Sequence, residues 1–481
     1  MPKNIYLGSS CCERQAATLS RRQLLTQSSL GFGGIGLSHL LARDGFAATP
    51  TEQRPAGWLS HAPATAKHVI FLFMQGGPSH LETFDPKPVL RRMDGQDLPE
   101  SFKNVNLAQT NTADGNLMGP AFPFRKHGES GLDISDRFPN LARHADDLAV
   151  IRSCYHETFI HGPAVTIMNT GTLLLGHPSV GAWAVYGLGS ANESLPAYVA
   201  MTDSYIVNSN ATYSSGFLPE VYQGTYLRTQ GVPIQNLSRP QELGARDQRL
   251  LLDQVSKWNG RHRDARPGDS RLDARIANYE IAFRMQTTAP ELIDVSGEPR
   301  HVRDLYGMDD EPTAKFGSMC LLARRMVERG VRYVHLISNG WDAHGECAKK
   351  HAELTGNVDR PIAGLLADLK QRGLLDSTLI VWAGEFGRTP IRQGANGRDH
   401  HPYGFSSWMA GGGIRGGQVI GATDDLGFHA VEDKVHVNDL HATMLSLLGL
   451  DHKELNFLFE GRYRRLTDVG GDNDLADRLR A

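Results

Sequence analysis

The sequence predicts an α/β fold, a doubly wound, mostly parallel sheet with helices on both faces. Three observations support this class. Continuous apolar runs recur along the chain, amphipathic helical stretches alternate with them, and polar clusters follow several of the runs directly. Runs that are apolar on both faces are typical of parallel strands covered by helices. In such sheets functional groups gather at the carboxyl ends of the strands.

The first 48 residues have the features of an export signal. Arg21 and Arg22 precede a mildly apolar, glycine-rich stretch, and the small residues Ala47 and Ala48 follow it. These features resemble a twin-arginine signal, so we expect export by the twin-arginine machinery to the periplasm or beyond. The alternative is a disordered basic N-terminus. We expect residues 49–66 to form a linker.

The main α/β domain is expected over residues 67–466, with a C-terminal tail at 467–481. Residues 67–74 (KHVIFLFM) predict its first central strand. A helix whose apolar face includes Phe316 and Val327 is closed by Gly330, and residues 331–338 predict the next strand.

The alternation continues to the end of this domain. An amphipathic helix around residues 362–369 precedes a strand at 378–383 (TLIVWA). Residues 406–410 predict a further short strand. Residues 437–448 predict a helix with Asn438 as its N-cap.

Residues 241–312 differ from the rest of the domain. They are rich in Arg, Asp and Gln, and helical periods recur around 250–258 and 272–285. We interpret the segment as a helical insertion, either a lid or a solvated charged surface.

Composition excludes several classes of protein. Among 481 residues, 50 Lys and Arg balance 53 Asp and Glu, so neither nucleic acid nor an anionic membrane is expected as a general partner. No apolar run approaches the ~18 residues of a transmembrane anchor. No C-x-x-C pair occurs among the five cysteines, which argues against a structural zinc knuckle. Disulfide pairing stays open among Cys154, Cys320 and Cys347.

Two polar clusters follow the first and second predicted strands. After residues 67–74, two glycines let the backbone turn tightly beside a bound molecule. Metal ligands or acid–base groups are available in the same segment from Gln75, His80, Glu82 and Asp85. A tight turn with surface polar groups is the alternative. After residues 331–338, Asp342 and His344 can point at one cation, although a D-x-H pair on a surface loop is common.

Two further clusters come later in the chain. Glu385 follows the strand at 378–383, and Arg388 can clamp an oxyanion or form an ion pair with that glutamate. In Asp399-His400-His401, adjacent histidines point in different directions on extended chain, so one of them at most joins the other groups. Four clusters at successive strand ends favour a metal site.

Longer motifs carry a resemblance to a known family. GGPSHLETFDPKP, WDAHGE, GEFGRTP, GRDHH with AGGGIRGG, and LNFLFEGRYRRLTDV are similar to an uncharacterised bacterial domain-of-unknown-function family of twin-arginine-exported, sulfatase-like proteins. More distantly, the layout resembles the alkaline phosphatase and sulfatase superfamily, whose members hold two metal ions at strand ends. That resemblance implies metal ligation by Asp342, His344 and His400, with His401 as the rival of His400.

The chain departs from the superfamily pattern at three places. Gln75 stands where members have an Asp, and Glu385-Phe386 stands where they have Asp-His or Asp-Asn. His161 stands at the nucleophile's place in a segment otherwise similar to C-x-P-S-R followed by L-x-T-G. No cysteine is therefore available for formylglycine. His161 can be a metal ligand, a base, a phosphohistidine nucleophile or a structural residue.

These residues together favour an exported, metal-dependent hydrolase of a phosphate or sulfate ester, small-molecule or glycan. Zinc is favoured by ligand type for Asp342, His344 and His400, with calcium or manganese as alternatives. Glu385 and His161 would bind a second ion or act as base, and Arg388 would hold the non-bridging oxygens. One alternative is a degenerate member that binds sulfated or phosphorylated glycans or helps assemble an exported complex. A phosphoryl mutase or transferase is another.

Overall fold

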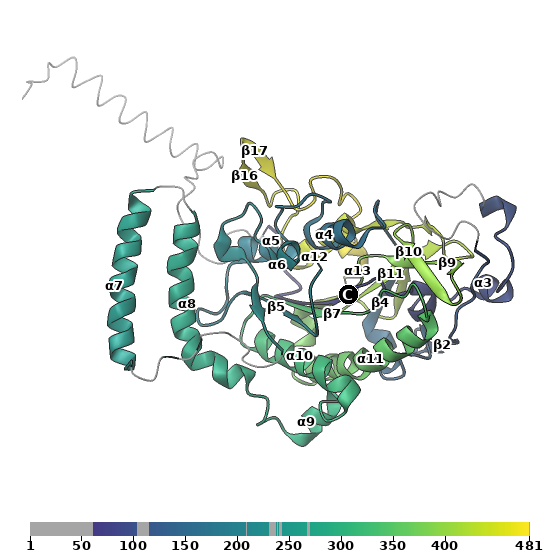
Figure 1. Cartoon of the computed structure of the whole chain (residues 1–481), viewed down its shortest axis with the longest axis horizontal. Helices are drawn as coiled ribbons and strands as arrows, with labels where there is room; N and C mark the ends of the chain where they lie inside the picture. Colours follow the sequence, from purple (N-terminus) through teal and green to yellow (C-terminus); the bar gives the residue numbers. More distant parts are fainter. Residues whose placement is uncertain are drawn as a thin grey trace, which may run out of the picture. The chain divides into compact units, whose positions relative to one another are not determined.

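The computed structural model (Figure 1) describes residues 61–102, 115–207, 209–229, 237, 239, 243–266 and 270–480. The chain divides into two units, residues 1–54 and 55–481. The expected export signal at 1–48 and most of the expected linker at 49–66 lie outside the described residues.

A nine-stranded sheet forms the centre of the described chain, in the order β12-β4-β11-β8-β1-β7-β5-β6, with β15 also beside β4. All pairings are parallel except those of β11, which runs antiparallel to β4 and β8. The strands are β1 (His68–Met74), β4 (Leu148–Tyr155), β5 (Tyr198–Thr202), β6 (Thr225–Leu227), β7 (Tyr333–Ser338), β8 (Thr378–Ala383), β11 (Phe405–Ala410), β12 (Gln418–Ile420) and β15 (Val435–His436).

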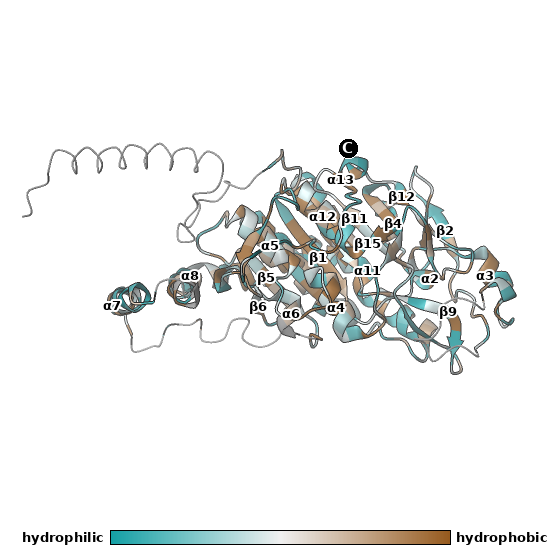
Figure 2. Ribbon diagram, turned by 90° about the horizontal axis from the view of Figure 1, so that it is seen from above, coloured by the Kyte–Doolittle hydropathy of each residue, from teal (hydrophilic) through white to brown (hydrophobic). Residues whose placement is uncertain are grey.

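Helices cover both faces of this sheet, as Figure 1 shows. On one side lie α4 (His161–Thr170), α5 (Val180–Leu188) and α12 (Val437–Leu447), and on the other lie α10 (Glu311–Glu328) and α11 (Cys347–Gln371). Side chains of β1 alternate between the two layers, because successive residues of a strand point to opposite faces. Figure 2 shows the central strands as the most apolar part of the molecule. The predicted doubly wound, mostly parallel α/β class is confirmed.

The strands and helices predicted from apolar patterns are present, most of them with small shifts at their ends. The helix predicted around residues 362–369 is much longer, since α11 begins at Cys347. One detail was wrong: the N-cap of α12 is His436 rather than Asn438. The His436 side chain accepts the N–H of Asn438 at 3.2 Å, and Asp439 accepts the N–H of His436 at 2.8 Å. This reciprocal pair places Asn438 inside the first turn of the helix.

Smaller elements complete the described chain. They are α2 (His80–Thr83), α3 (Pro88–Arg92), β2 (Phe124–His127), β3 (Leu132–Ser135), α6 (Ser209–Tyr213), α9 (Arg300–Leu305), β9 (Gly387–Gln393), β10 (Gly397–His401), β13 (Ala422–Thr423), β14 (Ala430–Glu432), β16 (Phe457–Phe459), β17 (Arg462–Arg464) and α13 (Ala476–Leu479). Leu475 and Leu479, in the segment expected as a tail, are buried against the α12 layer.

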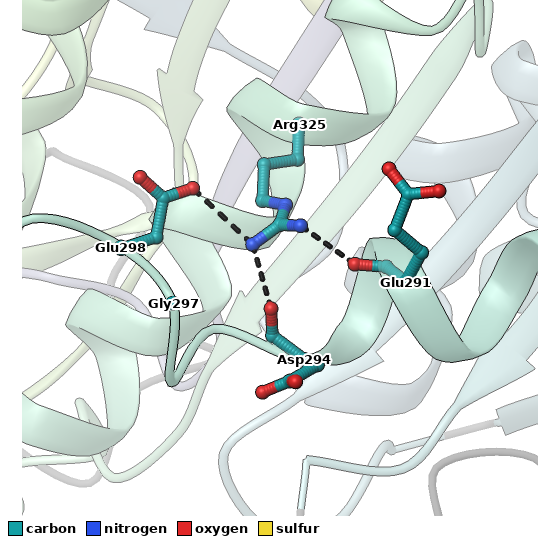
Figure 3. A pocket seen from close by; sticks show the side chains of 5 residues that line it. All are labelled: Glu291, Asp294, Gly297, Glu298 and Arg325. Carbon is teal, nitrogen blue, oxygen red and sulfur yellow. Dashed lines mark hydrogen bonds and ion pairs between the residues drawn. The ribbon is translucent and has the colours of Figure 1, made fainter.

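Two long helices occupy the segment expected as an insertion, α7 (Ala245–Asp264) and α8 (Ser270–Ile293). They lie side by side in both views (Figures 1 and 2). The end of α8 packs into the domain through buried Leu292. A small pocket there is lined by Glu291, Asp294, Gly297, Glu298 and Arg325. Figure 3 shows Arg325 reaching from α10 into it, where it donates to backbone carbonyls and to Glu298. The pocket is thus spanned by a bonded arginine.

The structure shows whether the three cysteines of the main domain form disulfides, which the sequence left open. Cys154, Cys320 and Cys347 are buried and unpaired, so none of them forms a disulfide. Within the described residues, no helix has both the length and the apolar character needed to cross a bilayer.

The turn after β1 depends on a missing side chain. Gly76 has φ +118°, and a Cβ atom there would lie 2.5 Å from the backbone nitrogen of Asp342. We expect Gly76→Ala to lower the free energy of unfolding by about 2 kcal/mol or more, through backbone strain and displacement of Asp342. Urea unfolding measures it.

Gly356→Ala is the matched control, because that glycine lies in α11 with nothing within 4 Å of the added carbon. It should keep stability or raise it by about 0.5–1 kcal/mol. Equal effects of the two substitutions would contradict the close approach at Gly76.

Candidate metal centre

The candidate site lies where three neighbouring parallel strands end. β1 lies between β7 and β8, so the segments that follow these strands meet at one edge of the sheet. They supply Gly76, Asp342 and Glu385, respectively. The backbone N–H of Gly76 donates to both carboxylate oxygens of Glu385, at 2.8 and 3.0 Å. This contact ties the loops after β1 and β8 together.

Three imidazoles surround the carboxylate of Asp342. The Nε2 atoms of His344 and His400 lie 3.1 and 3.2 Å from its Oδ1 atom. His161 Nε2 lies 3.4 Å from Oδ2. One ligand atom from each of the four residues falls within 4.8 Å of every other. Groups that are far apart in the sequence therefore converge on one point, as a shared cation requires.

The other ring nitrogen of each histidine is held by an acceptor. His161 Nδ1 donates to Glu385 Oε1 at 2.7 Å, and His400 Nδ1 donates to the carbonyl oxygen of Phe159 at 2.7 Å. His344 Nδ1 donates to Gln393 Oε1 at 2.6 Å. Because these acceptors carry no proton, each Nδ1 must carry it, and a neutral ring then has its lone pair on Nε2. When the rings are neutral, all three lone pairs face Asp342.

That arrangement needs a positive charge at its centre. Lone pairs directed at carboxylate oxygens repel them unless a proton or a cation lies between. His161 Nε2 is buried and has no hydrogen-bond partner. Acceptors behind the imidazoles that fix the tautomer are typical of metal-ligating histidines. The donor set thus fits a divalent ion.

The electrostatics agree with this interpretation. Burial by itself would raise the pKa of Asp342, but the three adjacent imidazoles and Arg388 hold it well below its usual range. Burial lowers the pKa of His161, yet Asp342 and Glu385 raise it overall to about 9. The pKa of His344 is raised by Asp342, whereas burial lowers that of His400. The centre attracts positive charge.

Local structure explains how each ligand reaches the centre. His161 is the first residue of α4, which follows β4, and Asp342 and His344 lie on the loop after β7. His400 lies within β10, which pairs antiparallel with β9 so that His400 is opposite Arg388. The fourth sequence cluster therefore lies at the end of a hairpin strand, and that strand is outside the central sheet, which the sequence did not predict.

Arg388 is fully buried and its donors are occupied. Its guanidinium donates to the carbonyl oxygens of Gly76, Gly77 and Arg398, and to Asp342 Oδ1 at 2.7 Å. The same contacts position Asp342. Glu385 is also fully buried and lies behind His161, so it supports that ring instead of lining the open face.

Four other candidates lie around the centre without joining it. Gln75 bonds to Asn339 and to the loop after β5. His80 and His401 are buried and bond to the carbonyl oxygens of Gly427 and Phe428. Asp399 Oδ1 lies 3.7 Å from His344 Nδ1, at the rim. Among the described residues, the group at Asp342 is the one set with metal-ligand geometry.

The sequence did not point to three contributors. Gln393 and the Phe159 carbonyl orient His344 and His400, and the Phe386 ring lies 4.9 and 4.6 Å from the His161 and His400 rings. A hairpin prediction from residues 387–401, which carry the turn Gly394-Ala395-Asn396-Gly397, would have placed Arg388 opposite His400 and Gln393 beside the turn, opposite Gly397.

Comparisons with known proteins give one family and a distant fold likeness. Residues 66–477 match the model of the family described as protein of unknown function (DUF1501). The chain matches no curated protein.

Among solved structures, the PsFucS1 sulfatase from Pseudoalteromonas sp. is similar over 80% of this chain and 68% of its own, at 14% identity and a TM-score of 0.36. The alkaline phosphatase from the Antarctic bacterium TAB5 is similar over 80% of this chain and 99% of its own, at 10% identity and a TM-score of 0.35. The lipoteichoic acid synthase LtaP from Listeria monocytogenes is similar over 84% of this chain and 76% of its own, at 8% identity and a TM-score of 0.37. Similarity at this level says nothing about the reaction of this chain.

The hairpin that carries His400 is anchored by a buried ion pair. Arg398 and Glu82 have fully buried side chains and lie 2.9 Å apart. We expect Arg398→Met to lower the free energy of unfolding by about 3–5 kcal/mol, because it leaves the Glu82 charge buried without an opposite charge, with the Ala121 N–H as its remaining donor. Urea unfolding followed by circular dichroism measures it.

Lys349→Met serves as the control, since it breaks an exposed pair with Glu346. Exposed pairs contribute little, so its stability should stay close to that of the unaltered chain. An Arg398→Met loss no larger than that of the control would refute the anchoring role.

Proposed function

The chain belongs to the DUF1501 family of proteins of unknown function, and we propose that it is a metal-dependent hydrolase of an anionic ester. A phosphate or a sulfate ester, small-molecule or glycan, is the proposed substrate. The convergence of three histidine Nε2 atoms on the Asp342 carboxylate carries the proposal. Its proposed place of action is outside the cytoplasm, on the evidence of Arg21, Arg22 and the segment that follows them.

Ligand type supports zinc as the ion. His161, His344, His400 and Asp342 form a nitrogen-rich donor set with one carboxylate, which suits zinc better than calcium, whose ligands are oxygens. This assignment revises the sequence hypothesis, in which His161 belonged to a second ion or acted as base. Glu385 orients His161 from behind, as carboxylates do for ligating histidines.

The centre is open enough for a substrate. The side chains of Asp342 and His344 are 43% and 40% exposed, whereas Arg388 and Glu385 beneath them are fully buried. A divalent ion held there would supply Lewis-acid polarisation of an ester oxygen. The chain itself contributes the N-terminal end of α4 at His161, where the helix dipole favours an anionic group.

The buried groups keep the ligands fixed while a substrate binds. Arg388 fixes Asp342, and Glu385 fixes the proton on His161 Nδ1. Ligands that are already oriented in the free protein need no reorganisation when charge develops on the substrate, which is the condition for electrostatic catalysis.

Metal binding is the first test. The full-length chain, stripped with a chelator and titrated with zinc, should bind one ion per chain. Asp342→Asn should weaken zinc binding by about 100-fold or more, because it removes a ligand. Gln393→Leu should weaken it by about 10- to 100-fold, because the His344 ring is then no longer oriented by a hydrogen bond. Calorimetry and elemental analysis measure both.

His301→Ala is the matched control, because that histidine is exposed and lies outside the centre. It should bind zinc with unchanged affinity. Undiminished zinc content in Asp342→Asn would count against the centre.

Turnover is the second test. Aryl phosphate and aryl sulfate esters should be hydrolysed in the presence of zinc, manganese or calcium, with the strongest activity expected for zinc. His161→Ala should lower kcat/KM by about 100-fold or more, and His301→Ala should leave it unchanged.

The alternatives give different results in the same assay. Retained metal without turnover of any ester supports the binding-only protein. A labelled phosphoryl group trapped on His161 supports the mutase or transferase.

A further inference from the structure

Helix α7 has an apolar stripe that the described chain leaves uncovered. Leu250, Leu251 and Trp258 are 59%, 55% and 58% exposed. At 3.6 residues per turn, Leu251 and Trp258 lie on one face of the helix together with Asp247 and Gln254. We define the α7 stripe as Asp247, Leu250, Leu251, Gln254, Trp258 and Arg261.

The opposite side of α7 is already occupied by α8. Arg249 donates to both carboxylate oxygens of Glu280, at 2.7 and 3.0 Å, and its guanidinium lies 5.0 Å from the Phe283 ring. In Figures 1 and 2, α8 lies between α7 and the sheet. The α7 stripe is on a different face from Arg249, so it is free to meet another molecule. Contiguous exposed apolar side chains bordered by charges are typical of interaction sites.

We propose that the α7 stripe is the interface between two copies of this chain, paired antiparallel across a two-fold axis. The stripe is complementary to itself in that orientation. With the axis next to Gln254, Leu251 of one copy lies against Trp258 of the partner subunit, and the reverse contact follows by symmetry. Each large apolar side chain thereby meets a large apolar side chain.

Charge selects the antiparallel orientation. The N-terminal end of the stripe carries Asp247, and its C-terminal end carries Arg261. Antiparallel pairing brings these opposite charges together twice, whereas parallel pairing would bring like charges together. Helix α7 has 20 residues and is therefore about 30 Å long, so two antiparallel copies of it can be in contact over about five helical turns.

A second copy fits the stripe better than an anionic lipid surface does. Asp247 lies on the stripe itself and would face the lipid headgroups, whereas in the pair it meets Arg261 of the partner subunit. The inference is independent of the proposed hydrolase, because α7 contributes nothing to the metal centre.

The test measures self-association of the full-length chain by sedimentation velocity over a wide concentration range. We expect a dimer. Leu251→Lys and Trp258→Lys should each weaken it by about 100-fold, because a substitution occurs twice in a two-fold interface. Leu458→Lys alters an equally exposed residue of β16, 54% exposed, and should leave the dimer intact.

Charge exchange tests the orientation. Asp247→Arg and Arg261→Asp should each weaken the dimer, and the double variant should restore it, because each pair is then reversed as a whole. Cooperative thermal unfolding of all variants shows that they fold.

Three results would overturn the proposal. They are a monomer at every concentration, a dimer that survives both lysine variants, and a monomer that binds vesicles of anionic lipid through Leu251 and Trp258.

Discussion

The buried carboxylate of Glu385 is the contact on which the site depends. It accepts the Gly76 N–H with both oxygens and the His161 Nδ1 proton with one, and so joins the ends of β1 and β8 to the start of α4. A fully buried carboxylate is costly unless its oxygens are bonded. These three elements therefore hold one relative position. That position places His161 Nε2 beside Asp342.

The sequence was most informative where burial on both faces left a continuous apolar run. β1, β7 and β8 were predicted for this reason, and their adjacency brought Asp342 and Glu385 to one edge of the sheet. β4 and β5 were not predicted, although both are mostly buried. Arg152 and Ser153 interrupt the apolar run of β4, because this strand also binds the loops that lie over it.

The parts of the site that could not be predicted depend on register and on backbone groups. Choosing His400 over His401 requires the β9–β10 pairing, which turns alternate side chains to opposite sides. The partner of His400 is a carbonyl oxygen of Phe159, and any residue supplies such an oxygen. Arg388 suggested an anion clamp by its residue type. The structure shows instead that Arg388 is buried and that its N–H groups donate to backbone carbonyl oxygens and to Asp342.

The same contacts favour a single cation in the proposed centre. The side-chain amide of Gln75 forms hydrogen bonds with Asn339 and with the loop after β5. The carboxylate of Glu385 accepts hydrogen bonds from Gly76 and His161. Neither is free to hold a second ion. The carboxylates of Asp342, Glu385 and Asp399 against Arg388 leave two net negative charges, which a divalent ion would neutralise. With that charge neutralised, the helix dipole at the start of α4 favours an anionic ester over a neutral one.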